Sequence, residues 1–210
     1  MKGLFISIEG ADGSGKSTQI ELLRNYLEKN NYKSVLTREP GGTIISEAIR
    51  NIILDKKYME MSDMTEALLY AASRAQHVEE YIKPLLEKGN IVICDRFVDS
   101  SVVYQGYARG LGISCIENIN KYATKGLEPD ITILLDINAE EGIKRKKNQR
   151  ELDRLELQKL EFHKKVSEGY RELSNMYPNR IKRIDASKSV EDISNEIIST
   201  VKQLINDKYK

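Results

Sequence analysis

The sequence predicts an α/β fold in which a five-stranded, mostly parallel sheet is flanked by helices on both faces. The first observation behind this prediction is a series of short, continuously apolar runs, the pattern of strands covered on both faces. The second is the helical spacing of apolar residues in the segments between these runs. Strands that alternate with helices in this way pair in parallel, and such a sheet binds ligands at the carboxyl ends of its strands.

The elements follow one another along the whole chain. The predicted strands are residues 4–8, 35–37, 91–94, 131–135 and, with a weaker pattern, 181–184. Apolar residues recur on one helical face at Ile20, Leu23 and Leu27, at Ile45, Ile49 and Ile53, and at Ile193, Ile197, Val201 and Leu204. No Pro-, Gly- or Ser-rich linker divides the chain, so we expect residues 1–210 to form a single domain.

Composition and charge exclude several classes of protein. Hydrophobic residues make up 40% of the 210 residues and charged residues 31%, which is enough apolar content for a core and argues against intrinsic disorder. The 33 basic and 32 acidic residues leave a net charge of +1, whereas a dedicated nucleic-acid binder has a strong excess of basic residues. No apolar run approaches the ~20 residues that span a bilayer, the first residues do not resemble a signal peptide, and two cysteines are too few for a disulfide scaffold. We therefore expect a soluble cytoplasmic protein that has neither a membrane nor a nucleic acid as partner.

A glycine-rich motif follows the first predicted strand. Residues 10–17, GADGSGKS, fit the pattern G-x-x-x-x-G-K-[ST] between a predicted strand and a predicted helix; the alternative is an ordinary glycine-rich turn. Glycines let successive backbone N–H groups curl around phosphate oxygens, and the helix N-terminus adds positive potential. In this motif Lys16 reaches the β- and γ-phosphates and the Ser17 hydroxyl binds Mg²⁺. The residues predicted to bind the donor nucleotide are Gly10, Ala11, Asp12, Gly13, Ser14, Gly15, Lys16, Ser17 and Thr18.

A second acidic group for the metal site comes from the end of another buried strand. Asp95 directly follows the apolar run 91–94, and Arg96 comes next. The carboxylate is predicted to bind Mg²⁺ together with Ser17, and Arg96 is predicted to neutralise charge as a phosphoryl group moves. A local ion pair or a cap is the alternative for this Asp-Arg pair.

Five segments, taken in order, carry a family resemblance over nearly the full chain. They are the phosphate loop with Asp12, residues 37–43 (TREPGGT), residues 68–77 (LLYAASRAQH), residues 95–97 (DRF) with 99–106 (DSSVVYQG), and the basic segment that ends at residues 151–154 (ELDR). With these segments the chain resembles the thymidylate kinases, of the nucleoside monophosphate kinase group. The resemblance implies a three-layer P-loop kinase fold that transfers the γ-phosphoryl group of ATP to dTMP, giving dTDP and ADP in dTTP synthesis. It also implies Mg²⁺ as cofactor and a homodimer.

The resemblance further implies which residues bind the acceptor. Arg38 and Arg96 would hold the 5′-phosphate of dTMP, and Asp12 its 3′-hydroxyl. The ring at position 70, which is Tyr in this chain and more often Phe in the family, would stack on thymine, while Arg74 would hydrogen-bond a base carbonyl. The full set of residues expected to bind dTMP is Asp12, Arg38, Glu39, Pro40, Arg50, Tyr70, Arg74, Arg96, Ser101, Tyr104 and Gln105.

Some of these assignments have structural alternatives. Gln105 would approach the base edge and Tyr104 would pack beneath the sugar, where a ribose 2′-hydroxyl would be crowded; instead, they could cap the next helix. Arg50 would face the acceptor site or form a surface ion pair. His77 has no chemical duty and is expected to be structural, and the cysteines, Cys94 and Cys115, are expected to be small core residues.

A basic segment follows the fourth predicted strand. Residues 144–154, KRKKNQRELDR, contain six basic and two acidic residues, and a solvated helix face is one interpretation. Because the phosphate loop has no Arg or Lys before Lys16, the charge of the transition state must be met from elsewhere. This resembles the bacterial arrangement, in which a mobile lid, here at about residues 142–155, carries the catalytic arginines. The predicted catalytic residues are Lys16, Arg96, Arg150 and Arg154, with Lys146 and Lys147 as alternatives within the lid, while Arg145 is predicted to bind ATP against adenine, near residues 185–187.

Two other functions remain as hypotheses. A nucleotide-dependent switch of the GTPase type would need an Asn-Lys-x-Asp guanine reader, and the nearest string, residues 120–123 (NKYA), lacks the acidic residue. A kinase for another deoxynucleotide or for a deoxynucleoside is the second hypothesis. Arg38 discriminates between these acceptors, since a neutral nucleoside would gain little from a guanidinium group that a monophosphate would bind.

Overall fold

The computed structural model describes residues 3–146, 153–155 and 157–208. Its centre is a sheet of five strands in the order β2-β3-β1-β4-β5, in which all four neighbouring pairs are parallel. The strands are β1 (Leu4–Glu9), β2 (Ser34–Arg38), β3 (Ile91–Asp95), β4 (Ile131–Asp136) and β5 (Ile181–Asp185). The predicted parallel sheet is therefore confirmed.

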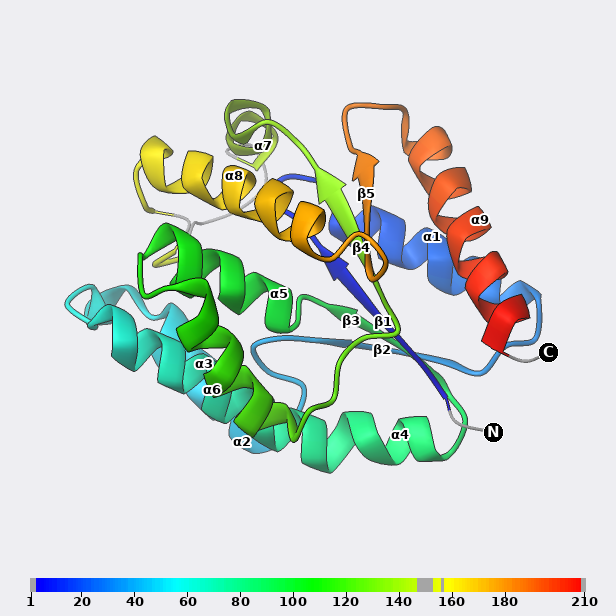
Figure 1. Cartoon of the computed structure of the whole chain (residues 1–210), viewed down its shortest axis with the longest axis horizontal. Helices are drawn as coiled ribbons and strands as arrows, with labels where there is room; N and C mark the ends of the chain where they lie inside the picture. The colour runs from blue at the N-terminus through cyan, green and yellow to red at the C-terminus, as the bar shows by residue number, and fades with distance from the viewer. Residues whose placement is uncertain (1–2, 147–152, 156, 209–210) are drawn as a thin grey trace.

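Helices cover both faces of this sheet, as predicted. Figure 1 shows α1 (Lys16–Lys29) and α9 (Val190–Lys208) on one face. The opposite face carries α2 (Ile44–Leu54), α3 (Asp63–His77), α4 (Lys83–Glu87), α5 (Val98–Ser101), α6 (Ile113–Thr124) and α8 (Leu160–Met176), and α7 (Ala139–Lys146) follows β4. Three shorter helical segments complete the described part. They are a 3₁₀ turn, η1 (Lys56–Tyr58), and two π-helical segments, η2 (Val78–Ile82) and η3 (Val102–Ala108).

The strands extend one residue beyond the apolar runs that predicted them. In every strand this last residue is charged: Glu9, Arg38, Asp95, Asp136 and Asp185. The carboxyl ends of parallel strands meet at one edge, where ligands bind. Charged residues gather at this edge, so hydrophobicity alone underestimates the strand lengths.

Helix α2 packs differently from the prediction. Ile53 is fully buried, but Ile45 is 53% exposed and Ile49 is only half-buried. The reason lies in the contact with α3, where Ser46 Oγ donates to Ser73 O at 2.9 Å and Ser73 Oγ donates to Ser46 O at 3.3 Å. The buried face of α2 therefore runs through Ser46 and Ile53, seven residues apart, and leaves Ile45 outside.

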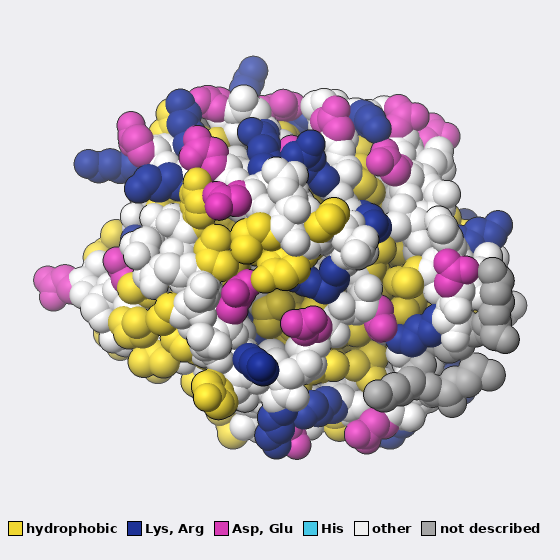
Figure 2. Space-filling view, in the orientation of Figure 1, with side chains coloured by type: hydrophobic (Ala, Val, Ile, Leu, Met, Phe, Trp, Pro, Cys, Tyr) yellow, Lys and Arg dark blue, Asp and Glu magenta, His cyan; other side chains and the backbone are white. Residues whose placement is uncertain are grey.

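Two further expectations concern the surface and the thiols. Figure 2 shows Lys and Arg side chains interspersed with Asp and Glu on the visible face, in agreement with the net charge of +1. None of the helices within the described residues is long and apolar enough to cross a membrane. Both cysteines are free: Cys94 is buried, as expected, and burial raises the pKa of its thiol, whereas Cys115 on α6 is only half-buried.

Candidate functional site

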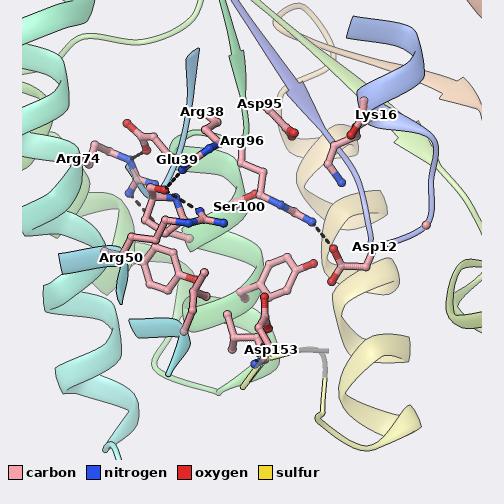
Figure 3. A pocket seen from close by; sticks show the side chains of 18 of the residues that line it. Asp12, Lys16, Arg38, Glu39, Arg50, Arg74, Asp95, Arg96, Ser100 and Asp153 are labelled. Atoms are coloured by element: carbon pink, nitrogen blue, oxygen red, sulfur yellow. Dashed lines mark hydrogen bonds and ion pairs between the residues drawn. The ribbon is translucent and has the colours of Figure 1, made fainter. Parts of the chain in front are cut away.

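A cavity of about 790 Å³ opens at the carboxyl edge of the sheet. It is lined by the loop after β1, by the segments that follow β2 and β3, and by side chains of α2, α3, η3 and α7. Figure 3 shows Asp12 and Lys16 on one side of this cavity, Arg50, Arg74 and Glu39 on the other, and Arg96 between them. The cavity therefore has two unlike sides joined by one arginine.

The loop between β1 and α1 forms the first side. Gly15 has a φ of 90°, a left-handed conformation that glycine adopts without strain, and it places the N-terminus of α1 at the cavity. Lys16 begins this helix and its Nζ donates to Gly10 O at 3.1 Å and Ala11 O at 3.3 Å. The ammonium group thus curls back over the loop, and Ser17 in the same first turn lines the cavity. Backbone N–H groups, the helix N-terminus and a lysine together favour an anion such as a polyphosphate.

Asp95 provides a carboxylate suited to a hard cation. One of its oxygens, Oδ1, is buried and has no hydrogen-bond partner among the described residues. Both Asp95 and Ser17 line the cavity. In the part of the chain that the structure describes, no group of three His, Cys, Asp or Glu residues could enclose a metal ion. A cation there would take few protein ligands and keep water and phosphate oxygens, which is how Mg²⁺ is usually bound, so the residues present fit it.

Arg96 connects the two sides. Its backbone is left-handed, with a φ of 68°, a conformation that is uncommon for a residue other than glycine and is concentrated at functional sites. The guanidinium donates to Asp12 Oδ1 at 2.9 Å and to Ser100 Oγ and Tyr170 Oη, both at 3.2 Å. The group also lies 5.3 Å from the centre of the Tyr104 ring, within cation–π range. Contacts on several sides therefore fix the direction in which Arg96 points.

A buried carboxylate holds the strand end behind Arg96. Glu9 accepts hydrogen bonds from Phe97 N at 2.6 Å, Ser100 Oγ at 2.5 Å and Tyr170 Oη at 2.9 Å. Burial raises the pKa of the Glu9 carboxyl, and the nearby charge of Asp99 raises it further. Glu9 thus ties β1, the turn after β3 and helix α8 together beneath the cavity.

Arg74 forms the centre of the second side. It is 1% exposed and its Nε donates to Glu39 at 2.6 Å. Its Nη1 donates to Ser101 Oγ at 3.0 Å and to Asn120 Oδ1 at 2.6 Å, and its Nη2 donates to Phe97 O at 3.0 Å. We call the group of Glu39, Arg74, Ser101, Gln105 and Asn120 the base wall. All of it is buried, so its geometry is set before any ligand arrives.

His77 supports this wall from behind. It is fully buried, with Nδ1 3.0 Å from Glu39 Oε1 and Nε2 2.6 Å from Thr37 Oγ1. Both ring nitrogens are engaged, which agrees with the structural role expected for His77. A Cβ at Gly42 would lie 2.5 Å from the same ring, and Gly42 has a φ of 93°, so this turn accepts only glycine.

Two more guanidinium groups converge at the turn after β2. Arg38 Nη1 and Arg50 Nη1 both donate to the carbonyl of Pro40, at 2.9 and 2.7 Å. Arg38 also pairs with Glu47 at 3.0 Å, whereas burial and the positive charge of Arg38 lower the pKa of Arg50. Like charges this close favour an anion between or beside them, so this turn is suited to a second phosphate.

Comparisons with known proteins agree with this geometry. The family model for thymidylate kinase matches residues 8–197. The chain is 52% identical to the thymidylate kinase of Clostridium novyi over 198 residues, covering 93% of this chain and 97% of that protein. It is also 52% identical to the thymidylate kinase of a Thermoanaerobacter species over 205 residues, covering 98% and 100%. The crystal structure of thymidylate kinase from Ehrlichia chaffeensis superposes with a TM-score of 0.77 at 34% identity, covering 96% of this chain and 99% of that one.

The chain belongs to the thymidylate kinase family. Most of the site residues that the sequence predicts for such an enzyme lie around the cavity at the carboxyl edge of the sheet. Those that line it are Asp12, Gly13, Gly15, Lys16, Ser17, Thr18, Arg38, Glu39, Pro40, Arg50, Tyr70, Arg74, Asp95, Arg96, Ser101, Tyr104, Gln105 and Arg145. Gly10, Ala11 and Ser14 belong to the same loop behind this surface. Arg145 Nη1 donates to Ala186 O at 3.2 Å, which brings the two segments predicted to lie near adenine into contact.

Arg154 lies elsewhere than predicted for a thymidylate kinase lid arginine. It is 1% exposed, its Nε donates to Ile53 O at 2.8 Å, and its guanidinium pairs with the buried carboxylate of Glu66. Its neighbours Asp153 and Leu155 line the cavity, but Arg154 turns inward. The physical reason is Glu66, a buried acid that requires a cationic partner and that the sequence pattern does not reveal. Residues 147–152, which include the other predicted lid arginine, Arg150, lie outside the described residues.

Four residues that shape the site are not predicted from the sequence: Glu9, Glu66, Asn120 and Tyr170. Glu9 had one usable signal, an acid that interrupts a buried apolar strand directly before a phosphate loop. Asn120 belongs to the string NKYA, which lacks the acidic residue of a guanine reader and gives no other signal. Glu66 and Tyr170 lie on helices with ordinary spacing and gave no signal of their own.

Proposed function

We propose that this chain transfers the γ-phosphoryl group of ATP to dTMP in the cavity described above, giving dTDP and ADP for dTTP synthesis. Family membership supports the reaction. The observation that carries it within this chain is the placement of Arg38 and Arg50 opposite the phosphate loop, with Arg96 between. The phosphate loop accounts for the phosphates of the donor. The guanidinium groups of Arg38 and Arg50 have a use only if the acceptor also carries a phosphate.

The loop would hold the donor. Lys16 and the N–H groups of residues 13–18 would bind the β- and γ-phosphates of ATP, and Arg145 would lie against its adenine. The Ser17 hydroxyl and the Asp95 carboxylate would hold Mg²⁺. When bound, this ion neutralises charge on the transferring phosphates.

The acceptor would be positioned rather than activated. A phosphate oxygen of dTMP is already an anionic nucleophile at neutral pH, so in-line attack needs orientation and no general base. Arg38, Arg50 and Arg96 would orient this phosphate, and Asp12 would accept a hydrogen bond from the 3′-hydroxyl of the sugar. The hydroxyl of Tyr104 is buried without a hydrogen-bond partner among the described residues, which fits a place beneath the sugar. The ring of Tyr70 would stack on the base.

Lys16 and Arg96 would stabilise the negative charge of the transition state, together with a basic side chain from the lid at about residues 142–155. Arg150 remains our prediction for that basic residue. For Arg154, the buried pair with Glu66 supports a positioning role near the end of this segment rather than contact with the moving phosphoryl group.

We further propose a cytoplasmic homodimer. The support for dimerisation is an apolar surface on α2, where Ile44 is 88%, Ile45 53% and Ile52 43% exposed, continuing to Leu68 on α3, 52% exposed. Figure 2 shows hydrophobic side chains gathered at the left of the view, at the end of the molecule that carries α3. Two unpaired thiols are in keeping with a reducing compartment. Sedimentation would test the dimer, and a mass equal to one chain would contradict it.

The experiment that tests the reaction is an assay of purified protein with ATP and Mg²⁺ against dTMP, dUMP, CMP and thymidine. We expect the highest kcat/KM with dTMP and formation of dTDP and ADP in equal amounts. Turnover of thymidine without turnover of dTMP would instead establish a nucleoside kinase. Nucleotide binding without transfer to any of the four acceptors would favour a switch.

A further inference from the structure

A buried carboxylate lies behind Gln105, outside the residues that line the cavity. Glu66 is 0% exposed and belongs to the first turn of α3. Gln105 Nε2 donates to Glu66 Oε1 at 2.9 Å, and Arg109 Nη2 donates to Glu66 Oε2 at 3.1 Å. Arg154 pairs with Oε2 from the other direction. Gln105 itself lines the cavity, so Glu66 contacts a cavity residue without facing the cavity.

This contact determines which end of the Gln105 amide faces a ligand. The two ends have the same shape, but the nitrogen only donates hydrogen bonds and the oxygen only accepts them. A carboxylate held by two guanidinium groups offers acceptors only, so Gln105 must present its NH₂ group to Glu66. The reverse orientation would set the amide oxygen against a carboxylate oxygen. With Nε2 held against Glu66, Oε1 is at the opposite end of the amide and is the acceptor that Gln105 can offer to a ligand.

Arg74 offers the complementary group on the same wall. A guanidinium has five N–H donors, and the contacts of Arg74 with Glu39, Ser101, Asn120 and Phe97 O use one on Nε, two on Nη1 and one on Nη2. The second N–H of Nη2 is the donor that can serve a ligand. The wall thus offers a donor on Arg74 and an acceptor on Gln105. In thymine or uracil, the 4-carbonyl would accept from Arg74 and N3–H would donate to Gln105. Cytosine has an amino donor and a ring-nitrogen acceptor in these places, the opposite pattern.

We propose that Glu66 is a positioning residue that fixes Gln105 with Oε1 toward the base and thereby selects thymine and uracil over cytosine. This inference rests on the proposed function. Glu66 contacts neither substrate, and its effect passes entirely through the amide of Gln105. The arginines on its far side keep it an acceptor.

The test is Glu66→Gln, which preserves shape but can both donate and accept. Gln105 can then turn either way, so the ratio of kcat/KM for dTMP to that for dCMP should fall about tenfold, the worth of roughly one hydrogen bond. Where turnover of dCMP is too slow to measure, the ratio of the two inhibition or dissociation constants serves. KM for ATP should stay unchanged, because Glu66 does not line the donor side. Equal weakening of dTMP and dCMP would overturn the proposal.

Two controls separate orientation from stability. Arg109→Met removes one guanidinium from the same carboxylate but leaves an acceptor facing Gln105, so the thermal midpoint should fall while the dTMP to dCMP ratio stays at the wild-type value. Glu66→Asp keeps the acceptor and should retain the preference for dTMP. If Glu66→Gln does not fold, Glu66→Gln combined with Arg109→Met removes one negative and one positive charge, leaves only Arg154 charged beside the amide, and answers the same question. A wild-type chain that does not phosphorylate dTMP would contradict the proposed function, whereas an active chain with an unaltered ratio in Glu66→Gln contradicts this inference alone.

Discussion

The two sides of the cavity are built on different principles. On the donor side, Lys16 is held by carbonyl groups five and six residues earlier, and the loop relies on its backbone and a helix N-terminus. In the base wall, Arg74 is held by partners 23 to 46 residues away, all of them within the protein interior. A polyphosphate can be bound by local backbone geometry, whereas a base edge requires side chains brought together by the whole fold.

Because of this difference, substitutions in the base wall and on the donor side should affect stability and activity differently. A buried ion pair such as Arg74–Glu39 contributes to the fold and to recognition at once, because removing one partner leaves the other charge buried and unpaired. Donor-side groups face the cavity and contribute to chemistry with little effect on folding. The predictions below separate these two cases.

Arg74→Ala should produce the largest effect. It leaves Glu39 and Asn120 without their partner, and we expect a loss of about 3–5 kcal/mol in the free energy of unfolding. Recognition of dTMP should weaken far more than ATP affinity. Denaturant unfolding and separate titrations of the two nucleotides measure these effects. Equal weakening of ATP and dTMP would refute the role of Arg74 at the base.

Arg38→Ala is the matched control for that substitution. Arg38 also faces the acceptor, but its side chain is 47% exposed and its partner Glu47 is 39% exposed. Exposed pairs contribute about 0–1 kcal/mol, so unfolding should change little while KM for dTMP rises. If both arginine variants destabilised the chain alike, burial of the ion pair would not explain the cost of losing Arg74.

Lys16→Met should act on catalysis alone. Loss of a preorganised positive group at the transferring phosphate costs about 10²–10³ in kcat. The thermal midpoint should stay near that of the wild type, since Lys16 donates to two carbonyl groups of its own loop and bridges no distant elements through them. Lys29→Met, at the exposed far end of the same helix, is the control and should leave kcat unaltered. A kcat for Lys16→Met within tenfold of the wild type would contradict the assignment.

The same contrast explains what the sequence could predict. The phosphate loop is a local pattern, so its residues and spacing were sufficient. The strands were found because burial on both faces produces apolar runs, and the exposed side of α2 was not found because its buried face depends on Ser46 meeting Ser73 of another helix. Family resemblance supplied Arg74 and Gln105, and with them Glu39 and Ser101, which hold Arg74, but not Asn120 or Glu66.

Long-range partners account for most of what was missed. Asn120 meets Arg74 across 46 residues, Glu66 meets Gln105 across 39, and Tyr170 meets Glu9 across 161. Nothing in a single sequence links such pairs. The inward turn of Arg154 belongs to the same class, since a run of basic residues does not reveal which one will meet a buried acid.

The smallest effect concerns Glu9, which joins the two sides beneath Arg96. Burial raises the pKa of its carboxyl above the ordinary value of 4.5. Below that value Glu9 is protonated in both the folded and the unfolded chain, and as pH rises the unfolded chain ionises first. Between the unfolded and the folded pKa the folded chain therefore holds more protons, and stability falls with rising pH. Glu9→Gln cannot ionise and lacks this decline.

Denaturant unfolding of the wild type and Glu9→Gln at a series of pH values from 4 upward measures this directly. The difference between the two proteins is the useful quantity, because other titrating groups cancel in it. We expect the variant to gain stability relative to the wild type as pH rises, whatever constant offset the lost hydrogen bonds with Ser100 and Tyr170 impose. A difference that does not change with pH would mean that Glu9 ionises as easily in the fold as in the unfolded chain. In that case the hydrogen bonds to Glu9 would offset the cost of burying its charge. The Glu9 carboxylate would then not destabilise the folded chain at neutral pH.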